Sequence, residues 1–388
     1  MITLGIPKEV KPLEKRVGLI PSAVKILTEK GIKVLVEKNA GVGSGFPDSD
    51  YEKNGAEIVP DAASVYGQAG LIQKIKEPQS SEFNLLRKDQ ILFCFLHLAS
   101  PDQCKLVQAL VSAGTLAIGY ETFEVDGKLP LLAPMSEIAG GLASAYGAFF
   151  QAFPPPFSSP RKTGGGEEGG KEKLAAQLEK IASQYPHFDK TFKIGKVVIF
   201  GGGVAGFKAM EIALELGGSV TMIEMNPERA NFLKKFTPSV LNPREDLTKA
   251  LEAADVIIGC VHSRGQRAQL ILDAETLKKV SAAKKKVLMD VSIDQGGNFP
   301  ESHSTTYLDP VYRDSFGNLR FCVSNIPSLC GLAASKAISE ISLPYTTALA
   351  KNPQQAFQSF PELKKAINVH SGKVLIPAIL EAHQSNGK

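Results

Sequence analysis

The sequence predicts an α/β protein of two domains, each built on a parallel β-sheet. Short apolar runs alternate with helical patterns through residues 1–130, and the alternation resumes at residue 196. A glycine-rich turn joins one of these strands to a helix at residues 196–216. The chain has 388 residues, which is more than one hydrophobic core usually organises. We therefore expect two α/β domains.

The first 130 residues are expected to form one α/β domain. Helices are predicted from Pro21, near Tyr51 and from Pro101, and Gly31 ends the first of them. Residues 131–152 read as a strand end followed by a long helix of small residues. Strands are predicted at residues 2–6, 33–36, 57–59, 71–75, 91–96 and 116–120. Strands separated by helices indicate a parallel sheet.

Residues 153–173 break this pattern, because they combine Pro, Ser, Gly and charged residues with little apolar content. Such a composition predicts a flexible insert, which we place at about residues 153–190. A short amphipathic helix is expected within it at residues 174–184. We assign no chemistry to the insert.

The second half of the chain continues the α/β pattern. Strands are predicted at 197–200, 219–223, 256–261 and 286–291, and helices at 204–216, 246–254 and 276–282. Helical segments at 332–350, 353–367 and 374–386 finish the chain, and we expect them to return to the first domain. The predicted domains are therefore residues 1–131 with 328–388, which would hold the substrate, and residues 132–327, which would hold a nucleotide.

The glycine-rich turn predicts the nucleotide. Gly201, Gly203 and Gly206 fit G-x-G-x-x-G between a buried strand and a helix. In that motif the glycines allow a tight turn, close approach of a pyrophosphate and close helix–strand packing. Glu224 ends the next strand, where an acid can bind the ribose hydroxyls and would repel a 2′-phosphate. An ordinary glycine-rich turn is the alternative, but the ordered set of elements favours binding of NAD.

Composition excludes several other classes of protein. The net charge is +4 and the lysines are dispersed, which gives no support for nucleic-acid binding. No apolar run approaches the roughly 20 residues that span a bilayer, and the first residues contain no signal-peptide core. Three of the five cysteines, at positions 94, 260 and 322, lie in apolar strand-like runs. We expect a cytoplasmic protein with reduced cysteines and no membrane partner.

Four polar residues, Arg16, Lys76, His97 and Asp294, stand near the ends of apolar runs. Open α/β sheets bind ligands beyond the carboxyl ends of their strands. Taken singly, each residue is explained better as a solvated charge, a hydrogen-bonded core histidine or a turn former than as a site residue. Together they suit an amino or keto acid, since two cations would hold its carboxylate while the histidine and aspartate move protons. The six dispersed histidines show no metal-ligand spacing.

The ordered set of motifs resembles the alanine dehydrogenases and the related nicotinamide-binding subunit of the proton-pumping transhydrogenases. The matching stretches are GIPKEVKPLEKRVGLIPS, AGVGSGFPDSDY, KIKEP, FLHLA, LPLLAPMSEIAG, GGGVAG, VSIDQGG and CVSNIP followed by LPY. The resemblance implies two Rossmann-like domains separated by a cleft, NAD as the cofactor and a homohexamer.

The resemblance also implies roles for individual residues. Arg16, Lys76 and Asn325 would bind substrate, and His97 and Asp294 would form the acid–base pair. The implied cofactor contacts are Ser136, Gly201, Gly203, Val204, Ala205, Gly206, Glu224, Arg229, Val261, Val291, Asp294, Asn325 and Ile326.

The implied reaction is the reversible NAD-dependent oxidative deamination of L-alanine to pyruvate and ammonium, in which the cofactor supplies the hydride chemistry. Residues 261–270 and 328–335 depart from the family pattern, as does the insert, and Glu224 replaces a commoner Asp. Two alternatives therefore stay open. One is a dehydrogenase of another small amino acid or of an opine- or lysine-type imine, and the other is a non-catalytic protein that binds NAD(H).

Overall fold

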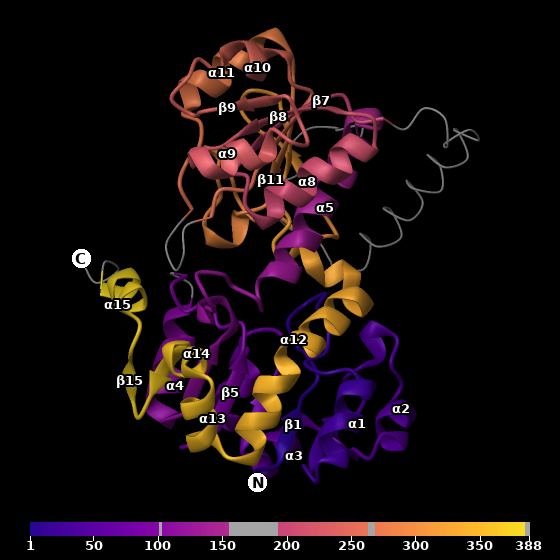
Figure 1. The fold of residues 1–388 in the computed structure, drawn as a ribbon, viewed down its shortest axis with the longest axis vertical. Coiled ribbons are helices and arrows are strands. Elements are labelled where there is room, and N and C mark those ends of the chain that lie inside the picture. The colour runs from indigo at the N-terminus through magenta and orange to yellow at the C-terminus, as the bar shows by residue number, and fades with distance from the viewer. Residues whose placement is uncertain (101–102, 155–192, 263–267, 385–388) are drawn as a thin grey trace. The chain divides into compact units, whose positions relative to one another are not determined.

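The computed structural model describes residues 1–100, 103–154, 193–262 and 268–384 (Figure 1). The predicted insert lies outside the described residues except for residues 153 and 154, and its helix at 174–184 lies wholly outside them. The chain divides into two compact units. Unit 1 contains Met1–Ser136 and Pro327–Lys388, and unit 2 contains Glu137–Ser263 and Ala268–Ile326.

Unit 1 is built on an eight-stranded sheet of order β15-β14-β6-β5-β4-β1-β2-β3. Its parallel strands are β1 (Leu4–Ile6), β2 (Val34–Glu37), β3 (Glu57–Val59), β4 (Leu71–Gln73), β5 (Ile91–Cys94) and β6 (Leu116–Gly119). Helices α1 (Pro21–Glu29), α2 (Asp48–Lys53), α3 (Ala62–Gln68) and α4 (Cys104–Ala113) lie between them in sequence. The strand order reverses between β1 and β4, which is the position where doubly wound sheets bind ligands.

Unit 2 repeats this plan in a seven-stranded sheet of order β12-β13-β11-β10-β7-β8-β9. The strands are β7 (Lys196–Phe200), β8 (Ser219–Ile223), β9 (Ser239–Leu241), β10 (Val256–Gly259), β11 (Val287–Asp290), β12 (Val311–Arg313) and β13 (Leu319–Phe321). Its helices are α5 (Ala133–Ala152, which begins in unit 1), α8 (Val204–Glu215), α9 (Pro227–Leu233), α10 (Thr248–Ala253) and α11 (Ala274–Ala283). Here the order reverses between β7 and β10. The predicted α/β fold with two Rossmann-like sheets is confirmed.

Two details of the predicted sheets are wrong. Each sheet ends in antiparallel pairing, at β12 in unit 2 and at β14 (Ile367–His370) and β15 (Lys373–Val374) in unit 1. The helical segment predicted at residues 353–367 is two helices, α13 (Pro353–Ser359) and α14 (Pro361–Lys365), and the segment predicted at 374–386 contains α15 (Pro377–Gln384). Residues 367–374, which lie between these helices, form a hairpin instead, because β14 pairs with the outer edge of β6.

Helix α12 (Gly331–Lys351) runs through the predicted segment 332–350 and is fastened to unit 1 by buried hydroxyl groups. Ser335 and Ser339 accept the backbone N–H groups of Val17 and Ile20, each at 3.0 Å. One and two turns further along the helix, Ser342 and Thr346 bond the side chain of Gln73 at 2.9 and 2.7 Å. Spacings of three and four residues put these hydroxyls on one face of the helix, so α12 binds the loop after β1 and the end of β4.

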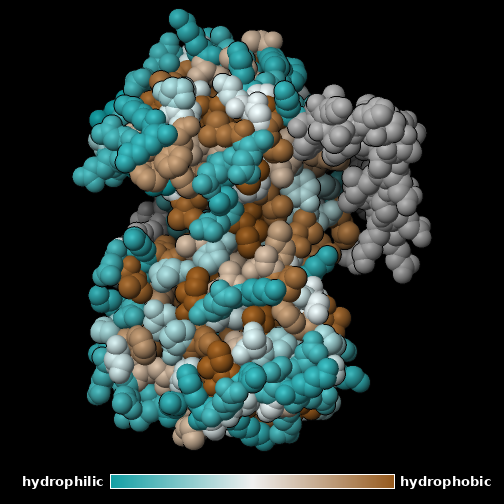
Figure 2. All heavy atoms as spheres, turned by 45° about the vertical axis from the view of Figure 1, so that its right-hand side comes forward, coloured by the Kyte–Doolittle hydropathy of each residue, from teal (hydrophilic) through white to brown (hydrophobic). Residues whose placement is uncertain are grey.

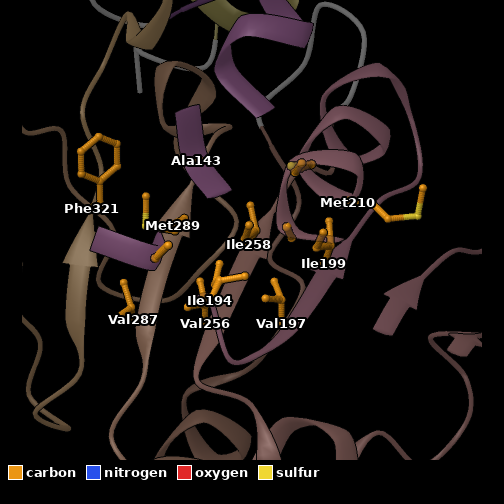
Figure 3. Close-up of a cluster of buried hydrophobic side chains, with 14 of the residues drawn as sticks. Ala143, Ile194, Val197, Ile199, Met210, Val256, Ile258, Val287, Met289 and Phe321 are labelled. Carbon is orange, nitrogen blue, oxygen red and sulfur yellow. The ribbon is translucent and has the colours of Figure 1, made fainter. Parts of the chain in front are cut away.

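One hydrophobic cluster of unit 2 lies against one face of its sheet (Figure 3), and a second, built on the alternate residues Val198 and Ile257, lies against the other face. Ile199, Ile258 and Met289, from β7, β10 and β11, gather in the first cluster with Ala143 of α5 and Met210 of α8. The small residues of α5 allow it to approach α8 closely, and a Cβ built at Gly140 would lie 2.0 Å from the carbonyl oxygen of Ala205. The predicted helix of small residues therefore packs tightly under the glycine-rich turn.

The surface and the cysteines agree with the composition. Hydrophilic side chains cover most of each unit in the face that Figure 2 shows. Within the described residues, every helix is too short or too polar to cross a membrane. The cysteines at 94, 260 and 322 are buried and unpaired, as predicted.

Candidate active site

Lys76 and His97 come together at the switch point of unit 1. Lys76 follows β4 and His97 follows β5, so both stand beyond the carboxyl ends of neighbouring parallel strands. The Nζ atom of Lys76 lies 3.0 Å from Nε2 of His97. Which nitrogen donates in this contact depends on the tautomer of the imidazole ring. The structure thus joins two of the predicted site residues into a cation–imidazole pair.

The backbone of His97 is held in an unusual conformation. Its φ of 51° lies in the left-handed region, which costs about 1–3 kcal/mol for a residue other than glycine. Glu121 compensates, since its carboxylate accepts the N–H of His97 at 2.6 Å and that of Leu96 at 3.1 Å. The His97 ring also stacks on Phe95. These contacts fix the direction of the imidazole.

Glu77, next to Lys76, supplies the compensating negative charge. It is 2% exposed and pairs with Lys11 at 2.7 Å and with Lys76 at 3.9 Å. Burial alone would raise the pKa of this carboxyl, but Lys76, His97 and Lys11 outweigh burial and lower the pKa to about 2. Glu77 is therefore ionised throughout the physiological range. Sequence reasoning passed over it, although the motif KIKEP contains it.

Arg16 is buried and already engages a carboxylate of its own chain. Its Nε donates to Glu14 at 2.7 Å, its Nη2 bonds the second oxygen of Glu14, and Nη1 contacts the sulfur of Met135 at 3.0 Å. Both Glu14 and Arg16 line a pocket of about 330 Å³, which Glu9 and the residues around Ala40 complete. A ligand carboxylate at Arg16 would share the guanidinium with Glu14, a partner that sequence reasoning missed.

The glycine-rich turn of unit 2 has the geometry that a dinucleotide needs. Gly203 caps the N-terminus of α8, and a Cβ built there would meet no atom within 4 Å. A Cβ at Gly206 would lie 1.8 Å from the carbonyl oxygen of Gly201. The first position therefore leaves the N-terminal N–H groups of α8 open, and the second sets the close helix–strand contact. The residues present fit NAD at this turn.

Glu224 and Arg229 hold the same turn from outside. The carboxylate of Glu224 accepts the N–H of Gly202 at 2.7 Å and that of Asn226 at 2.8 Å. The Nε of Arg229 donates to the carbonyl oxygen of Gly202. Its guanidinium lies over the rings of Phe207 and Phe232, 5.2 and 4.6 Å from their centroids. Both polar groups of the Gly202 peptide are thus fixed by residues that were predicted to touch only the cofactor.

Asp294 and Asn325 meet in unit 2. Asp294 lies in a short 3₁₀ helix (Ile293–Gln295) beyond β11, and its carboxylate accepts the N–H of Asn325 at 3.2 Å. The φ of Asn325 is 61°, a conformation that asparagine tolerates better than most residues. Beneath them Asp290 accepts the N–H of Asn298 at 2.9 Å, which fixes the glycine turn after Asp294. Sequence reasoning missed Asp290 and Asn298.

The other predicted cofactor residues lie near the same strand ends. Val261 follows β10, and Asn298 bonds both its N–H and its carbonyl oxygen, at 3.1 and 2.9 Å. Val291 follows β11 and donates to Gly259 at 3.0 Å. The carbonyl oxygen of Ile326 accepts from Tyr307 at 2.7 Å. Val204 and Ala205 begin α8, while Ser136 stands in the first turns of α5. Within the described part of the chain, no group of three or more His, Cys, Asp or Glu residues is placed to hold a metal ion.

Known proteins match both halves of the chain. The family description "Alanine dehydrogenase/PNT, N-terminal domain" matches residues 5–139, and "Alanine dehydrogenase/PNT, C-terminal domain" matches residues 189–377. The chain belongs to the alanine dehydrogenase/PNT family. It is 35% identical to an alanine dehydrogenase of Methanococcus maripaludis, covering 98% of this chain and 96% of that protein. It is also 35% identical to alanine dehydrogenase 2 of Staphylococcus aureus, with 99% and 97% covered.

Solved structures agree with this family. An L-alanine dehydrogenase superposes with a TM-score of 0.82 at 34% identity, and 99% of each chain is covered. A transhydrogenase from Sinorhizobium meliloti gives 0.74 at 21% identity, covering 97% of this chain and 99% of that one, and shows the shared fold. The C-terminal alanine dehydrogenase/PNT match extends through α12 to residue 377, so it includes strands of both compact units. The boundary between the two family domains in the sequence therefore differs from the boundary between the two compact units of the structure.

Proposed function

We propose that this chain catalyses the NAD-dependent oxidative deamination of L-alanine to pyruvate and ammonium, and the reverse reductive amination. The contact of Lys76 with His97 at the switch point of unit 1 carries the proposal. Near full-length similarity to proteins named alanine dehydrogenase supports it.

NAD is the proposed cofactor. The open N-terminus of α8, with no obstruction around Gly203, would receive the pyrophosphate. Glu224 stands at the end of β8, where its negative charge disfavours a 2′-phosphate. When bound, the nicotinamide supplies the hydride acceptor for the Cα–H bond of the amino acid.

The residues of unit 1 are proposed to hold the substrate and move protons. Arg16 would bind the carboxylate with Glu14 setting the plane of its guanidinium. Lys76 would bind the carbonyl oxygen of the keto acid through its ammonium group. His97, in contact with Lys76, would take the proton that is released as water adds to the oxidised carbon and would return it in the reverse reaction.

Asp294 and Asn325, which belong to unit 2, are the remaining residues to which we assign a role in the reaction. Asp294 would share the acid–base work, and Asn325 would contact substrate and cofactor. The cofactor contacts at Ser136, Val204, Ala205, Arg229, Val261, Val291 and Ile326 stay predictions from the family resemblance. We also propose a homohexamer, from that resemblance, and a cytoplasmic location, which the five unpaired cysteines support.

The test is formation of NADH, followed by its absorbance, from NAD and L-alanine at alkaline pH, with glycine, L-serine and L-lysine in parallel. Strong turnover of L-alanine alone supports the proposal. His97→Asn and Asp294→Asn should each lower kcat by about 10²–10⁴-fold with little change in NADH affinity. NADH binding without turnover of L-alanine would overturn the proposed substrate, and full activity of either variant would overturn that residue's role.

A further inference from the structure

Glu9 is a buried carboxylate that the proposed reaction does not use. It lies in the loop after β1 and is 7% exposed. Its Oε1 accepts the N–H of Ile75 at 2.6 Å and lies 3.4 Å from the N–H of Lys76. The two neighbouring strands β1 and β4 flank the switch point, so this one oxygen ties the loop after β1 to the backbone of the residue that contacts His97.

The second oxygen of Glu9 has no hydrogen-bond partner although it is buried. The nearest cation is Nζ of Lys74 at 3.8 Å, but Lys74 bonds Glu82 directly. Glu82 also accepts from Tyr66 at 3.1 Å. Two carboxylates therefore face one buried ammonium group, and an incompletely satisfied buried charge is costly.

The surroundings make Glu9 sensitive to protonation. Burial raises its pKa, Glu14 and Glu82 raise it further, and Lys74 with the Ile75 N–H lowers it, with a net value of about 7. In its ionised form the carboxylate is the stronger acceptor for the two N–H groups. In its protonated form that attraction weakens.

We propose that Glu9 is a positioning residue for Lys76, which in its ionised form holds the backbone after β4 so that the Lys76 ammonium meets His97. The inference rests on the proposed function of Lys76 and His97. A carboxylate that only stabilised the fold would contribute to unfolding free energy and leave the pH dependence of the reaction unchanged.

Three variants separate these two roles. Glu9→Gln keeps an oxygen in place for both N–H groups but cannot ionise. Glu9→Asp keeps the negative charge but, being one methylene shorter, moves the carboxylate away from both N–H groups. Glu37→Gln is the control. Glu37 also accepts a backbone N–H from the loop after β1, that of Lys8 at 2.8 Å, and its charge also interacts with Lys74 and Glu82, whereas the N–H groups of Ile75 and Lys76 are bonded by Glu9.

The kinetic measurement is kcat/KM for L-alanine between pH 5.5 and 10. If both His97 and Glu9 must be deprotonated, a plot of log(kcat/KM) against pH rises with a slope of about 2 on its acid side. In Glu9→Gln only His97 remains to be deprotonated, so this slope should fall to about 1. Glu9→Asp should lower kcat/KM by at least about tenfold with NADH affinity unchanged. Glu37→Gln should match the wild-type profile. An unchanged slope in Glu9→Gln, or wild-type kinetics in Glu9→Asp, would overturn the proposal.

A second measurement does not depend on turnover. NMR of protein labelled at histidine reports the environment of the His97 ring. Glu9→Asp and Glu9→Gln should shift the His97 resonances, while Glu37→Gln should leave them in place. If the wild type fails to oxidise L-alanine, the proposed function fails while this measurement still decides whether Glu9 positions the pair. Unshifted His97 resonances in Glu9→Gln, which is isosteric, would refute the positioning role.

Discussion

Two glycines of the same turn should respond differently to one added methyl group. At Gly203 a new Cβ points into open space, with no atom within 4 Å, whereas at Gly206 it would lie 1.8 Å from the carbonyl oxygen of Gly201. Real Cβ atoms essentially never come closer than 3.0 Å to such an atom. We therefore expect Gly203→Ala to damage NADH binding alone and Gly206→Ala to damage both binding and stability.

The magnitudes follow from these contacts. Gly203→Ala should change the free energy of unfolding by less than about 1 kcal/mol, because the lower entropy of the unfolded chain offsets a weaker N-cap. Its methyl group occupies the space of the pyrophosphate and should weaken NADH binding at least about tenfold, or about 1.4 kcal/mol. Gly206→Ala requires a shift of backbone in a packed core, which costs about 1–3 kcal/mol or more.

The assay pairs thermal unfolding without cofactor with NADH titration by fluorescence. Gly67→Ala in α3 is the control, since a Cβ there also meets nothing within 4 Å and the residue lies in unit 1. It should stabilise the helix by about 0.5–1 kcal/mol and leave NADH binding unchanged. Wild-type NADH affinity in Gly203→Ala, or an unchanged melting temperature in Gly206→Ala, would refute the reasoning.

Variants at three residues test the charges around the site. Glu77→Gln should be roughly 3 kcal/mol less stable than the wild type at pH 7, because folding lowers the pKa of Glu77. This difference in the free energy of unfolding should shrink as pH falls from 4.5 towards 2, where the carboxylate of the wild type takes up a proton. Calorimetry at pH 7 and 3.5 checks this. The melting temperature of Glu9→Gln minus that of the wild type should increase from pH 5 to pH 8. The pKa of Glu9 is raised in the folded protein, so the wild type loses stability as pH rises through about 7, whereas the variant has no group to ionise there. The same difference in melting temperature at both pH values would contradict this prediction. Arg229→Gln should weaken NADH binding more than Arg229→Lys, because lysine keeps a cation near the two rings. Equal affinities of the two variants would show that this cation is not needed for NADH binding.

The buried strands were the most predictable part of the fold. Strands covered on both faces read as continuous apolar runs, and β8 falls at the predicted residues, as does the edge strand β3. Strands β9, β12, β14 and β15, which lie at or next to the outer edges of the two sheets, escaped prediction. They are two to four residues long, and their pairing depends on a distant partner. No local pattern at residues 367–374 reports that the edge of β6 is free.

Some residues of the candidate site were predictable from the sequence, and their charged partners were not. The rule that ligands bind beyond strand ends predicted Lys76 and His97, and the structure brings them together. The carboxylates that hold the predicted residues were missed, among them Glu14 beside Arg16. Glu14 and Glu77 sit within two residues of the predicted cations that they contact, so the acids in EKR and KIKEP were a usable signal, whereas Glu121 is distant in sequence from His97. Which cation each acid would meet is set by the tertiary fold, which the local sequence does not report.

The hydroxyl-lined face of α12 has a consequence for synthesis of the chain. Ser335 and Ser339 satisfy backbone groups of Val17 and Ile20, residues translated more than 300 positions earlier. Until α12 leaves the ribosome, those N–H groups have no native partners, and the outer edge of β6 stays unpaired until β14 follows. The described strands of unit 2 all lie between residues 196 and 321, so this unit can fold as it emerges. We therefore expect unit 1 to complete its fold after unit 2, because residues 1–136 need the final part of the chain.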